Sequence, residues 1–108
     1  MVGVETEAGW LERGGELLSQ GAWSDARRVF ADGLHRVVGT TEEGAAAEGL
    51  AAAAWELEDG DDVFACRERA YRCYRNSGDD RGAGRMAAWL GLDAVHFRSE
   101  PAIAQGWF

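Results

Sequence analysis

The sequence predicts an all-α domain of tandem antiparallel helix hairpins, with about five or six helices in about 2.5 repeats. The 108-residue chain is 46% hydrophobic and contains one Pro, a composition typical of a folded, helix-rich domain. Apolar residues recur at three- and four-residue spacing, which is the spacing of one helix face. A helix–turn–helix pattern also recurs about every 37 to 40 residues. We therefore treat residues 1–108 as a single helical domain with hairpins at about 6–38, 41–77 and 80–108.

The first hairpin consists of a helix over about 6–20 and a second helix that Gly39 ends. Gly21 lies between them and breaks the helical pattern, and Ser24 is a candidate N-cap for the second helix. The apolar face of the first helix comprises Trp10, Leu11, Gly14, Leu17 and Leu18. The inward face of the second comprises Ala26, Val29, Phe30, Gly33, Leu34 and Val37.

The second hairpin begins at Thr40 and Glu43, which have the spacing of a capping box at a helix start. An Ala-rich helix runs from there to Leu57, and its small side chains let neighbouring helices approach closely. The acidic run 58–62 forms the turn and suits the positive end of the next helix, expected over about 63–76. The apolar stripe of that helix comprises Val63, Cys66, Ala70, Cys73 and Tyr74.

The third hairpin is expected to start with a long helix over about 80–97. Pro101 opens a sixth helix, because Pro is tolerated in a first helical turn. The chain ends on the apolar pair Trp107–Phe108, whereas terminal repeats normally have a polar outer face. We therefore expect these residues to be a fragment of a longer chain. On successive turns of the long helix lie Met86, Trp89, Leu90, Asp93 and Phe97.

Charge and targeting signals exclude several classes of function. Nineteen acidic residues against eleven basic ones, all Arg, give a net charge of −8, which disfavours nucleic acid and anionic membranes as partners. Glu5 and Glu7 stand where a secretion signal needs positive charge, and the sequence has no apolar run of about 18 residues. We therefore expect a cytoplasmic protein. Cys66 and Cys73 lie about 10 Å apart along one helix, so both are expected to be reduced.

The first hairpin resembles the tetratricopeptide repeat, a helical hairpin of about 34 residues. The signature positions hold Trp10, Gly14, Leu17, Gly21, Trp23, Ala26 and Phe30, with Gly33 in place of the usual Ala. The second hairpin matches at Ala51, Ala54, Val63 and Ala70, but Arg67 occupies a position that is usually large and apolar. The third matches at Leu90–Gly91, and Ala104 is a further candidate match. The resemblance implies that the hairpins stack into a right-handed superhelix.

The segment 66–79, together with 86–91 and 97–107, is similar to the repeat region of bacterial LuxR-type transcriptional regulators. In that family, the resemblance implies, such an array precedes a helix-turn-helix that binds DNA. The 108 residues contain no such module, so this segment is not expected to contact nucleic acid directly. The resemblance implies a non-enzymatic, protein-interaction or regulatory role. Similar arrays occur on cyclases and ATPase regulators, so the parent protein stays open.

In the resembled family, the first helix of each hairpin lines an inner groove that holds a peptide or partner helix. The partner would be a protein or peptide, including another domain of the same protein. Two alternatives stay open: self-association as a homodimer, and a small-molecule-sensing or accessory domain of a signalling enzyme. For Trp55, packing between hairpins is the competing interpretation. The groove positions carried over to this sequence are Leu11, Leu18, Ser19, Glu48, Trp55, Glu56, Arg85, Ala88, Leu92 and His96.

No cofactor, metal or catalytic residue is expected. The acidic run 58–62 lacks the ligand spacing of a calcium loop, and His35 and His96 have no partners at the spacing of a zinc pair. The Arg series on the fourth helix is interpreted as a solvated face with ion pairs, with binding of an acidic partner as the alternative. That series is Arg67, Arg69, Arg72 and Arg75. The Trp residues assigned to core packing are Trp10, Trp23 and Trp89.

Overall fold

A computed structural model describes residues 7–98, and within that range the chain is all-helical. No β-strand occurs in this part of the chain, so the predicted all-α class is confirmed. The expected sixth helix and the Trp107–Phe108 end lie outside the described residues. The elements are α1 (Glu7–Ser19), α2 (Trp23–Arg36), α3 (Glu43–Glu56), α4 (Gly60–Ser77) and α5 (Asp80–Asp93), followed by the π-helical turn η1 (Ala94–Arg98).

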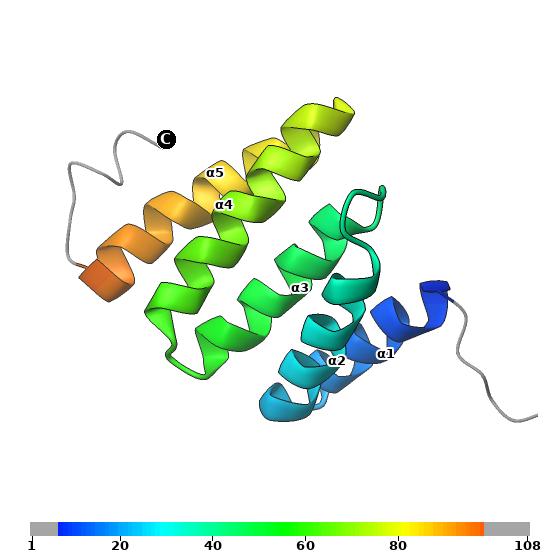
Figure 1. The fold of residues 1–108 in the computed structure, drawn as a ribbon. Coiled ribbons are helices and arrows are strands. Elements are labelled where there is room, and N and C mark those ends of the chain that lie inside the picture. Colours follow the sequence, from blue (N-terminus) through cyan, green and yellow to red (C-terminus); the bar gives the residue numbers. More distant parts are fainter. Residues whose placement is uncertain (1–6, 99–108) are drawn as a thin grey trace, which may run out of the picture.

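Consecutive helices pack side by side and run in opposite directions (Figure 1). α1 pairs with α2 and α3 pairs with α4, as expected for the first two hairpins. α2 and α4 each also pack against the first helix of the next hairpin, and α1 contacts α3. The described helices therefore form successive antiparallel hairpins, while the right-handed superhelix stays a prediction from the resemblance.

Two Asp residues cap the helices that follow the acidic turns. Asp59 Oδ1 accepts a hydrogen bond from the Asp62 N–H (3.2 Å), and Asp79 Oδ1 accepts one from the Gly82 N–H (2.9 Å). Each bond satisfies a backbone donor that is free at a helix start, and each carboxylate faces the positive helix end. As a result α4 begins at Gly60, earlier than the expected residue 63, because the acidic run supplies both the cap and the first turn.

The other two expected caps are wrong in detail. α2 begins one residue before Ser24, which lies inside the first turn and does not cap it. Ahead of α3, Thr40 Oγ1 accepts from the Glu42 N–H (3.2 Å), and Glu43 Oε1 accepts from the Gly39 N–H (2.8 Å). The two side chains of the expected capping box therefore bind backbone donors of the α2–α3 turn, and Glu42 is the N-cap residue.

The long helix expected over 80–97 divides at Asp93. α5 ends there, and the chain continues through the wider π-helical turn η1. This turn carries His96 and Phe97, and the rings of both lie against Trp55 of α3. π-Helical turns are rare and are found often near functional sites. The end of α5 is thus joined to α3 by the rings of His96, an expected groove position, and Phe97, an expected member of the apolar stripe.

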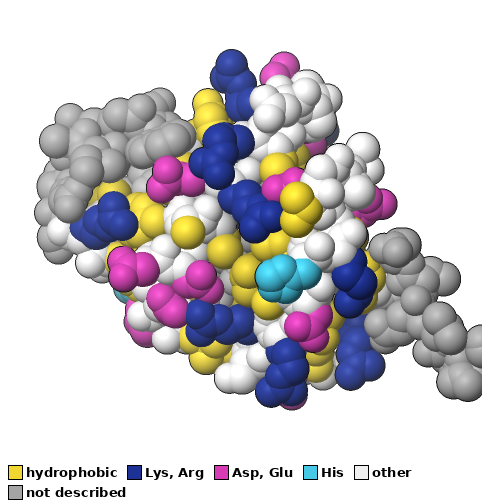
Figure 2. Space-filling model, in the orientation of Figure 1, with side chains coloured by type: hydrophobic (Ala, Val, Ile, Leu, Met, Phe, Trp, Pro, Cys, Tyr) yellow, Lys and Arg dark blue, Asp and Glu magenta, His cyan; other side chains and the backbone are white. Residues whose placement is uncertain are grey.

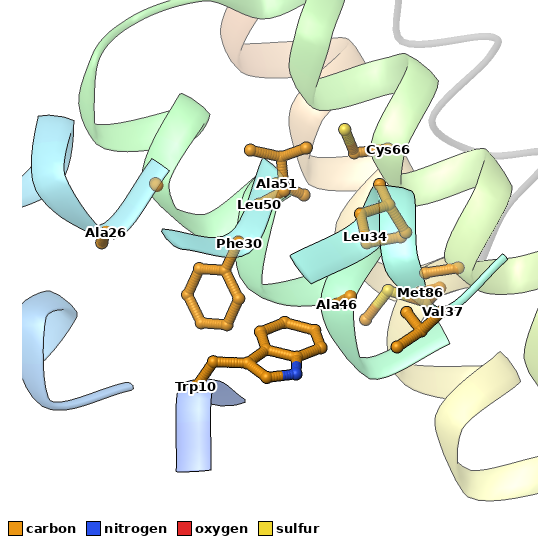
Figure 3. Close-up of a cluster of buried hydrophobic side chains, with 13 residues drawn as sticks. Trp10, Ala26, Phe30, Leu34, Val37, Ala46, Leu50, Ala51, Cys66 and Met86 are labelled. Carbon is orange, nitrogen blue, oxygen red and sulfur yellow. The ribbon is translucent and has the colours of Figure 1, made fainter. Parts of the chain in front are cut away.

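The main hydrophobic core lies between the first two hairpins (Figure 3). Trp10 of α1 and Phe30 of α2 face each other in it, and both are almost fully buried. α3 contributes mainly Ala side chains, so its backbone approaches α2 and α4 closely. The buried members are Trp10, Ala26, Phe30, Leu34, Val37, Ala46, Ala47, Leu50, Ala51, Ala53, Cys66, Ala70 and Met86.

Gly33 lets the Trp10 indole lie directly on the backbone of α2. A Cβ at this position would lie 2.2 Å from a carbon of the Trp10 ring, so Gly33→Ala is expected to lower the free energy of unfolding by about 1–3 kcal/mol. Gly15 of α1 has open space around it, and Gly15→Ala is expected to raise that free energy by up to about 1 kcal/mol. Urea unfolding followed by circular dichroism measures both. Equal effects of the two substitutions would contradict the close packing of Trp10 on Gly33.

Candidate functional site

Two helix faces meet in a groove between the second and third hairpins. On α3, Glu48, Ala52 and Trp55 follow at four- and three-residue spacing and share one face. On α5, Arg85 and Trp89 share a face in the same way. Hydrogen bonds join Glu48 to Arg85, and the rings of Trp55 and Trp89 lie 6.3 Å apart between centroids. The pocket between them has a volume of about 310 Å³, and we call it the α3–α5 groove; it is lined by Glu48, Ala52, Trp55, Glu56, Arg67 and Trp89.

The carboxylate of Glu48, which lines the α3–α5 groove, is held by three hydrogen bonds. Arg85 donates to both oxygens of Glu48, at 3.0 Å each, and the Tyr74 hydroxyl donates to Glu48 Oε1 at 2.6 Å. Burial alone would raise the pKa of Glu48, but these hydrogen bonds outweigh burial and the pKa lies below its ordinary value. Burial and the neighbouring carboxylate raise the pKa of Tyr74. Glu48 is therefore a fixed anion and Tyr74 a neutral donor.

The base of the α3–α5 groove is a buried ion pair. Arg67 is 3% exposed and Asp93 is 0% exposed, and Arg67 Nε donates to Asp93 Oδ2 at 3.1 Å. The other oxygen of Asp93 accepts from the indole N–H of Trp55 at 3.0 Å. Burial raises the pKa of Asp93 more than Arg67 and Trp55 lower it. The ion pair joins α4 to α5, and the hydrogen bond from Trp55 joins both to α3 and fixes the orientation of the Trp55 ring.

Aromatic rings form the walls of the groove. Trp55 stacks on His96 with centroids 4.6 Å apart, and His96 Nε2 lies 3.2 Å from a carboxylate oxygen of Glu58. The Arg67 guanidinium lies 4.6 Å from the centre of the Trp89 ring. Trp89 is nevertheless 38% exposed, so its assignment to the core is wrong. The indole covers the buried ion pair with one side and faces the groove and solvent with the rest.

No family model, curated protein or solved structure matches this chain. The resemblance to tetratricopeptide repeats and to LuxR-type regulators accordingly stays a prediction from the sequence.

The structure brings together groove positions from the second and third hairpins. Glu48, Trp55 and Glu56 line the α3–α5 groove, and Arg85 and His96 contact two of them. Two further positions lie on α5 without lining the groove: Leu92 is 51% exposed and Ala88 is half-buried.

The positions of the first hairpin do not join this groove. Leu11 and Leu18 pack against the main core and are half-buried. Ser19 is exposed at the end of α1, where its hydroxyl donates to the backbone carbonyl of Glu16 at 2.7 Å. The expected positions therefore do not form one groove that continues along all three hairpins.

Three residues that line the groove are not among the expected positions: Ala52, Arg67 and Trp89. Asp93, the buried partner of Arg67, is a fourth residue of the site that the expected positions do not include. The sequence does indicate Ala52 as a groove residue, because it lies four residues after Glu48 and three before Trp55, and residues at this spacing share a helix face. The pairing of Arg67 with Asp93 joins residues from different helices, and no local pattern indicates it. The departure of Arg67 from the repeat pattern was nevertheless the visible sign that this position is unusual.

Other Arg residues form ion pairs at the surface. Arg69 Nε donates to Glu43 at 2.8 Å, and Arg27 bridges Asp59 and Asp62 at 2.7 and 2.9 Å. Basic and acidic side chains are interleaved over the face of the molecule seen in Figure 2. The expected solvated face with ion pairs is confirmed for Arg69, whereas it is wrong for the buried Arg67.

A larger hollow of about 480 Å³ lies at the α3–α4 turn. Its polar lining includes Arg27 and Asp59, which are bound to each other, and Asp59 also caps α4. The exposed ion pairs and the cap account for these side chains. We therefore place the candidate site in the smaller α3–α5 groove, whose lining includes two indoles.

The described residues offer little for metal or nucleophile chemistry. Within 7–98, no three His, Cys, Asp or Glu side chains are placed to hold a metal ion. Burial raises the pKa of the Cys66 thiol to about 11, so this thiol is protonated at neutral pH. No helix in this part of the chain is long and apolar enough to span a membrane.

The lowered pKa of Glu48 predicts a loss of stability in acid. The carboxylate stabilises the fold fully above its unfolded pKa, near 4.5, and this contribution is lost as the pH falls through the lower folded pKa. Glu48→Gln is expected to lower the free energy of unfolding at pH 7 by about 1–2 kcal/mol and to flatten its decline below pH 5. Urea unfolding at pH 7, 5, 4 and 3 measures this. The control is Glu68→Gln at an exposed position of α4, and a decline equally steep in both variants would contradict the assignment to Glu48.

Proposed function

We propose that this chain is a non-enzymatic helix-hairpin domain that binds a peptide segment of a partner protein in the α3–α5 groove. The observation that carries the proposal is the pair of indoles, Trp55 and Trp89, lining one pocket while Trp89 is still 38% exposed. Trp is strongly enriched among the residues that dominate binding energy at interfaces. The volume of about 310 Å³ is at the lower end for ligand pockets and suits one or two inserted side chains.

Binding would use a groove that is already formed. Trp55 is held by the hydrogen bond that its indole N–H donates to Asp93, and Glu48 is held by the hydrogen bonds that Arg85 donates to it. The buried guanidinium of Arg67 supports the Trp89 ring. A partner therefore orders few side chains of this domain when it binds, which favours affinity. The mechanism is recognition by shape and charge, with no covalent step.

The sequence resemblance supports a place for this domain in a cytoplasmic transcriptional regulator of the LuxR type. In such a protein the bound segment would belong to a partner protein or to another domain of the same chain. The described residues support this proposal only through their helix hairpins.

Selection from a random 12-residue displayed peptide library tests the proposed groove. Ala52 lies at the groove and is half-buried, so Ala52→Leu fills the pocket without removing any of its hydrogen bonds. Ala45→Leu makes the same change at an exposed position of the same helix. We expect peptides that bind the parent chain and the Ala45→Leu variant but bind Ala52→Leu at least about tenfold more weakly, a difference of about 1.4 kcal/mol. Peptides that bind all three proteins equally, or no binding peptides at all, would reject the groove.

Self-association is a second candidate, favoured by three exposed apolar side chains. Trp89, Leu92 and Val95 follow one another at three-residue spacing near the end of the described chain, and they are 38%, 51% and 51% exposed. Light scattering over a range of concentrations detects a dimer, and Leu92→Glu is expected to abolish it, because a dimer interface would bury the new carboxylate. A monomer at all concentrations, or a dimer that persists in Leu92→Glu, would remove this candidate.

A further inference from the structure

We infer that the α3–α5 groove selects a partner segment that inserts a basic side chain, Arg or Lys, beside the two indoles. The inference rests on the proposed peptide-binding function and names the chemistry of its occupant. It is carried by the balance of charges in the groove, by the aromatic lining and by the sign of the charge on the whole chain.

One carboxylate at the groove has no partner among the residues that the structure describes. Glu48 is balanced by Arg85, with two hydrogen bonds of 3.0 Å, and Arg67 is balanced by Asp93. Glu56 also lines the groove, is exposed, and forms no hydrogen bond or ion pair with the described residues. An incoming cation can therefore pair with Glu56 without breaking a bond to any residue in 7–98.

Both cations at the site are already balanced by carboxylates. Arg67 is 3% exposed, so a ligand cannot reach its guanidinium without moving Trp89. Arg85 is exposed, but it does not line the groove and its charge is balanced by Glu48, to which it donates two hydrogen bonds. An acidic side chain in the groove would approach the carboxylates of Glu48 and Glu56, and the one cation in the lining, Arg67, is already paired with Asp93. This balance disfavours acidic peptides and phosphate groups.

The indole rings are a second feature of the groove that favours a basic side chain. The ring of Trp89 already has the Arg67 guanidinium 4.6 Å from its centre, so this indole accommodates a cation on a ring face. A second guanidinium or an ammonium on the open side would gain a cation–π contact, and its alkyl stem would lie along Ala52 and Trp55. Mutual repulsion with Arg67 is limited because Asp93 neutralises that charge.

The net charge of −8 also favours a basic partner, and it does so at distances beyond the contacts in the groove. A strongly negative chain attracts basic segments and speeds their encounter, and this attraction weakens as salt screens it. A basic peptide is therefore favoured both in the approach to the groove and within it.

The test uses the random 12-residue peptide library on the parent chain, followed by synthetic versions of the peptides whose binding Ala52→Leu weakens. We expect Arg or Lys to be enriched in these peptides over the unselected library. Replacing that residue by Gln should weaken binding about fivefold to tenfold on the parent chain. On the Glu56→Gln variant the same replacement should weaken binding by only about twofold to threefold, because the cation–π contact with Trp89 remains and the ion pair with Glu56 is absent. Glu68→Gln, at an exposed position outside the groove, should behave like the parent chain.

Each outcome separates this inference from the proposed function. Peptides that are sensitive to Ala52→Leu but show no enrichment of basic residues would overturn the basic-side-chain inference and leave the peptide groove standing. An Arg-to-Gln effect of equal size on the parent chain and on Glu56→Gln would overturn the role of Glu56 and the inference with it. The absence of any peptide sensitive to Ala52→Leu would reject the groove itself, and both proposals would fall.

Discussion

Replacing Arg67 with Met is expected to lower the free energy of unfolding by about 3–5 kcal/mol at pH 7, because the fully buried Asp93 carboxylate loses its cation. Asp93→Asn should cost a similar amount, since it leaves the Arg67 guanidinium buried without a counter-charge. In both variants the Trp55 indole N–H can still find an oxygen acceptor at position 93. The loss therefore reports mainly on the unpaired charge. Urea unfolding followed by circular dichroism measures it.

The double variant Arg67→Met/Asp93→Asn separates charge pairing from simple loss of packing. It contains no unpaired charge, so its stability should lie well above the sum of the two single losses, with a coupling of about 2 kcal/mol or more. Losses that add within about 0.5 kcal/mol would show that the two groups act independently and would contradict the ion pair at the base of the groove.

The pH dependence of Arg67→Met has a sign that distinguishes it from Glu48→Gln. The folded pKa of Asp93 already lies above its ordinary value because burial dominates, and removing Arg67 raises it further. A raised carboxylate pKa costs stability above the folded pKa, and the cost disappears as the pH falls below the unfolded pKa near 3.8. The difference between the parent chain and Arg67→Met should therefore shrink towards low pH. A difference that grows in acid would mean that Asp93 is not the group left unpaired.

The helices could be predicted from the sequence because their signals are local. The buried face of α2, including Phe30 and Leu34, follows from the spacing of apolar residues. The turns follow from Gly21 and Gly39, whose φ angles of 77° and 82° suit glycine best, and from the acidic run that caps α4. The exact cap positions at Ser24 and Thr40 could not be predicted, because they depend on which backbone donors the turn leaves free.

The groove was only partly predictable because its key contacts join distant helices. A helical pattern alone assigns Arg67 to the exposed, polar side of α4, because burying an Arg without a partner is unfavourable. Its burial becomes favourable only through Asp93 on α5, which the local sequence does not indicate. Trp89 shares the apolar spacing of Met86 and Leu90, which are buried, yet Trp89 lies at the edge of that stripe and faces the groove. Periodicity gives the width of an apolar face and does not tell which edge a neighbouring helix covers.

Phe30→Ala is expected to lower the free energy of unfolding by about 3–5 kcal/mol, because the ring fills a slot that no neighbouring side chain can close. Phe30 is 4% exposed and lies between Gly14 of α1 and Gly49 of α3, two residues without side chains.

The same geometry predicts an effect of Gly49→Ala that depends on Phe30. In the parent chain the new Cβ would lie 2.4 Å from the Phe30 ring, so the substitution should destabilise by about 1–3 kcal/mol.

In the Phe30→Ala background the sign of the Gly49→Ala effect should reverse. The methyl group then enters the space that the ring has left, and Ala is favoured over Gly inside a helix by about 1 kcal/mol. Urea unfolding of the four proteins in this cycle gives the coupling directly. If Gly49→Ala destabilised both backgrounds equally, the close approach of α1 and α3 around Phe30 would be wrong, and with it the packing that holds α3 against the first hairpin and sets one wall of the α3–α5 groove.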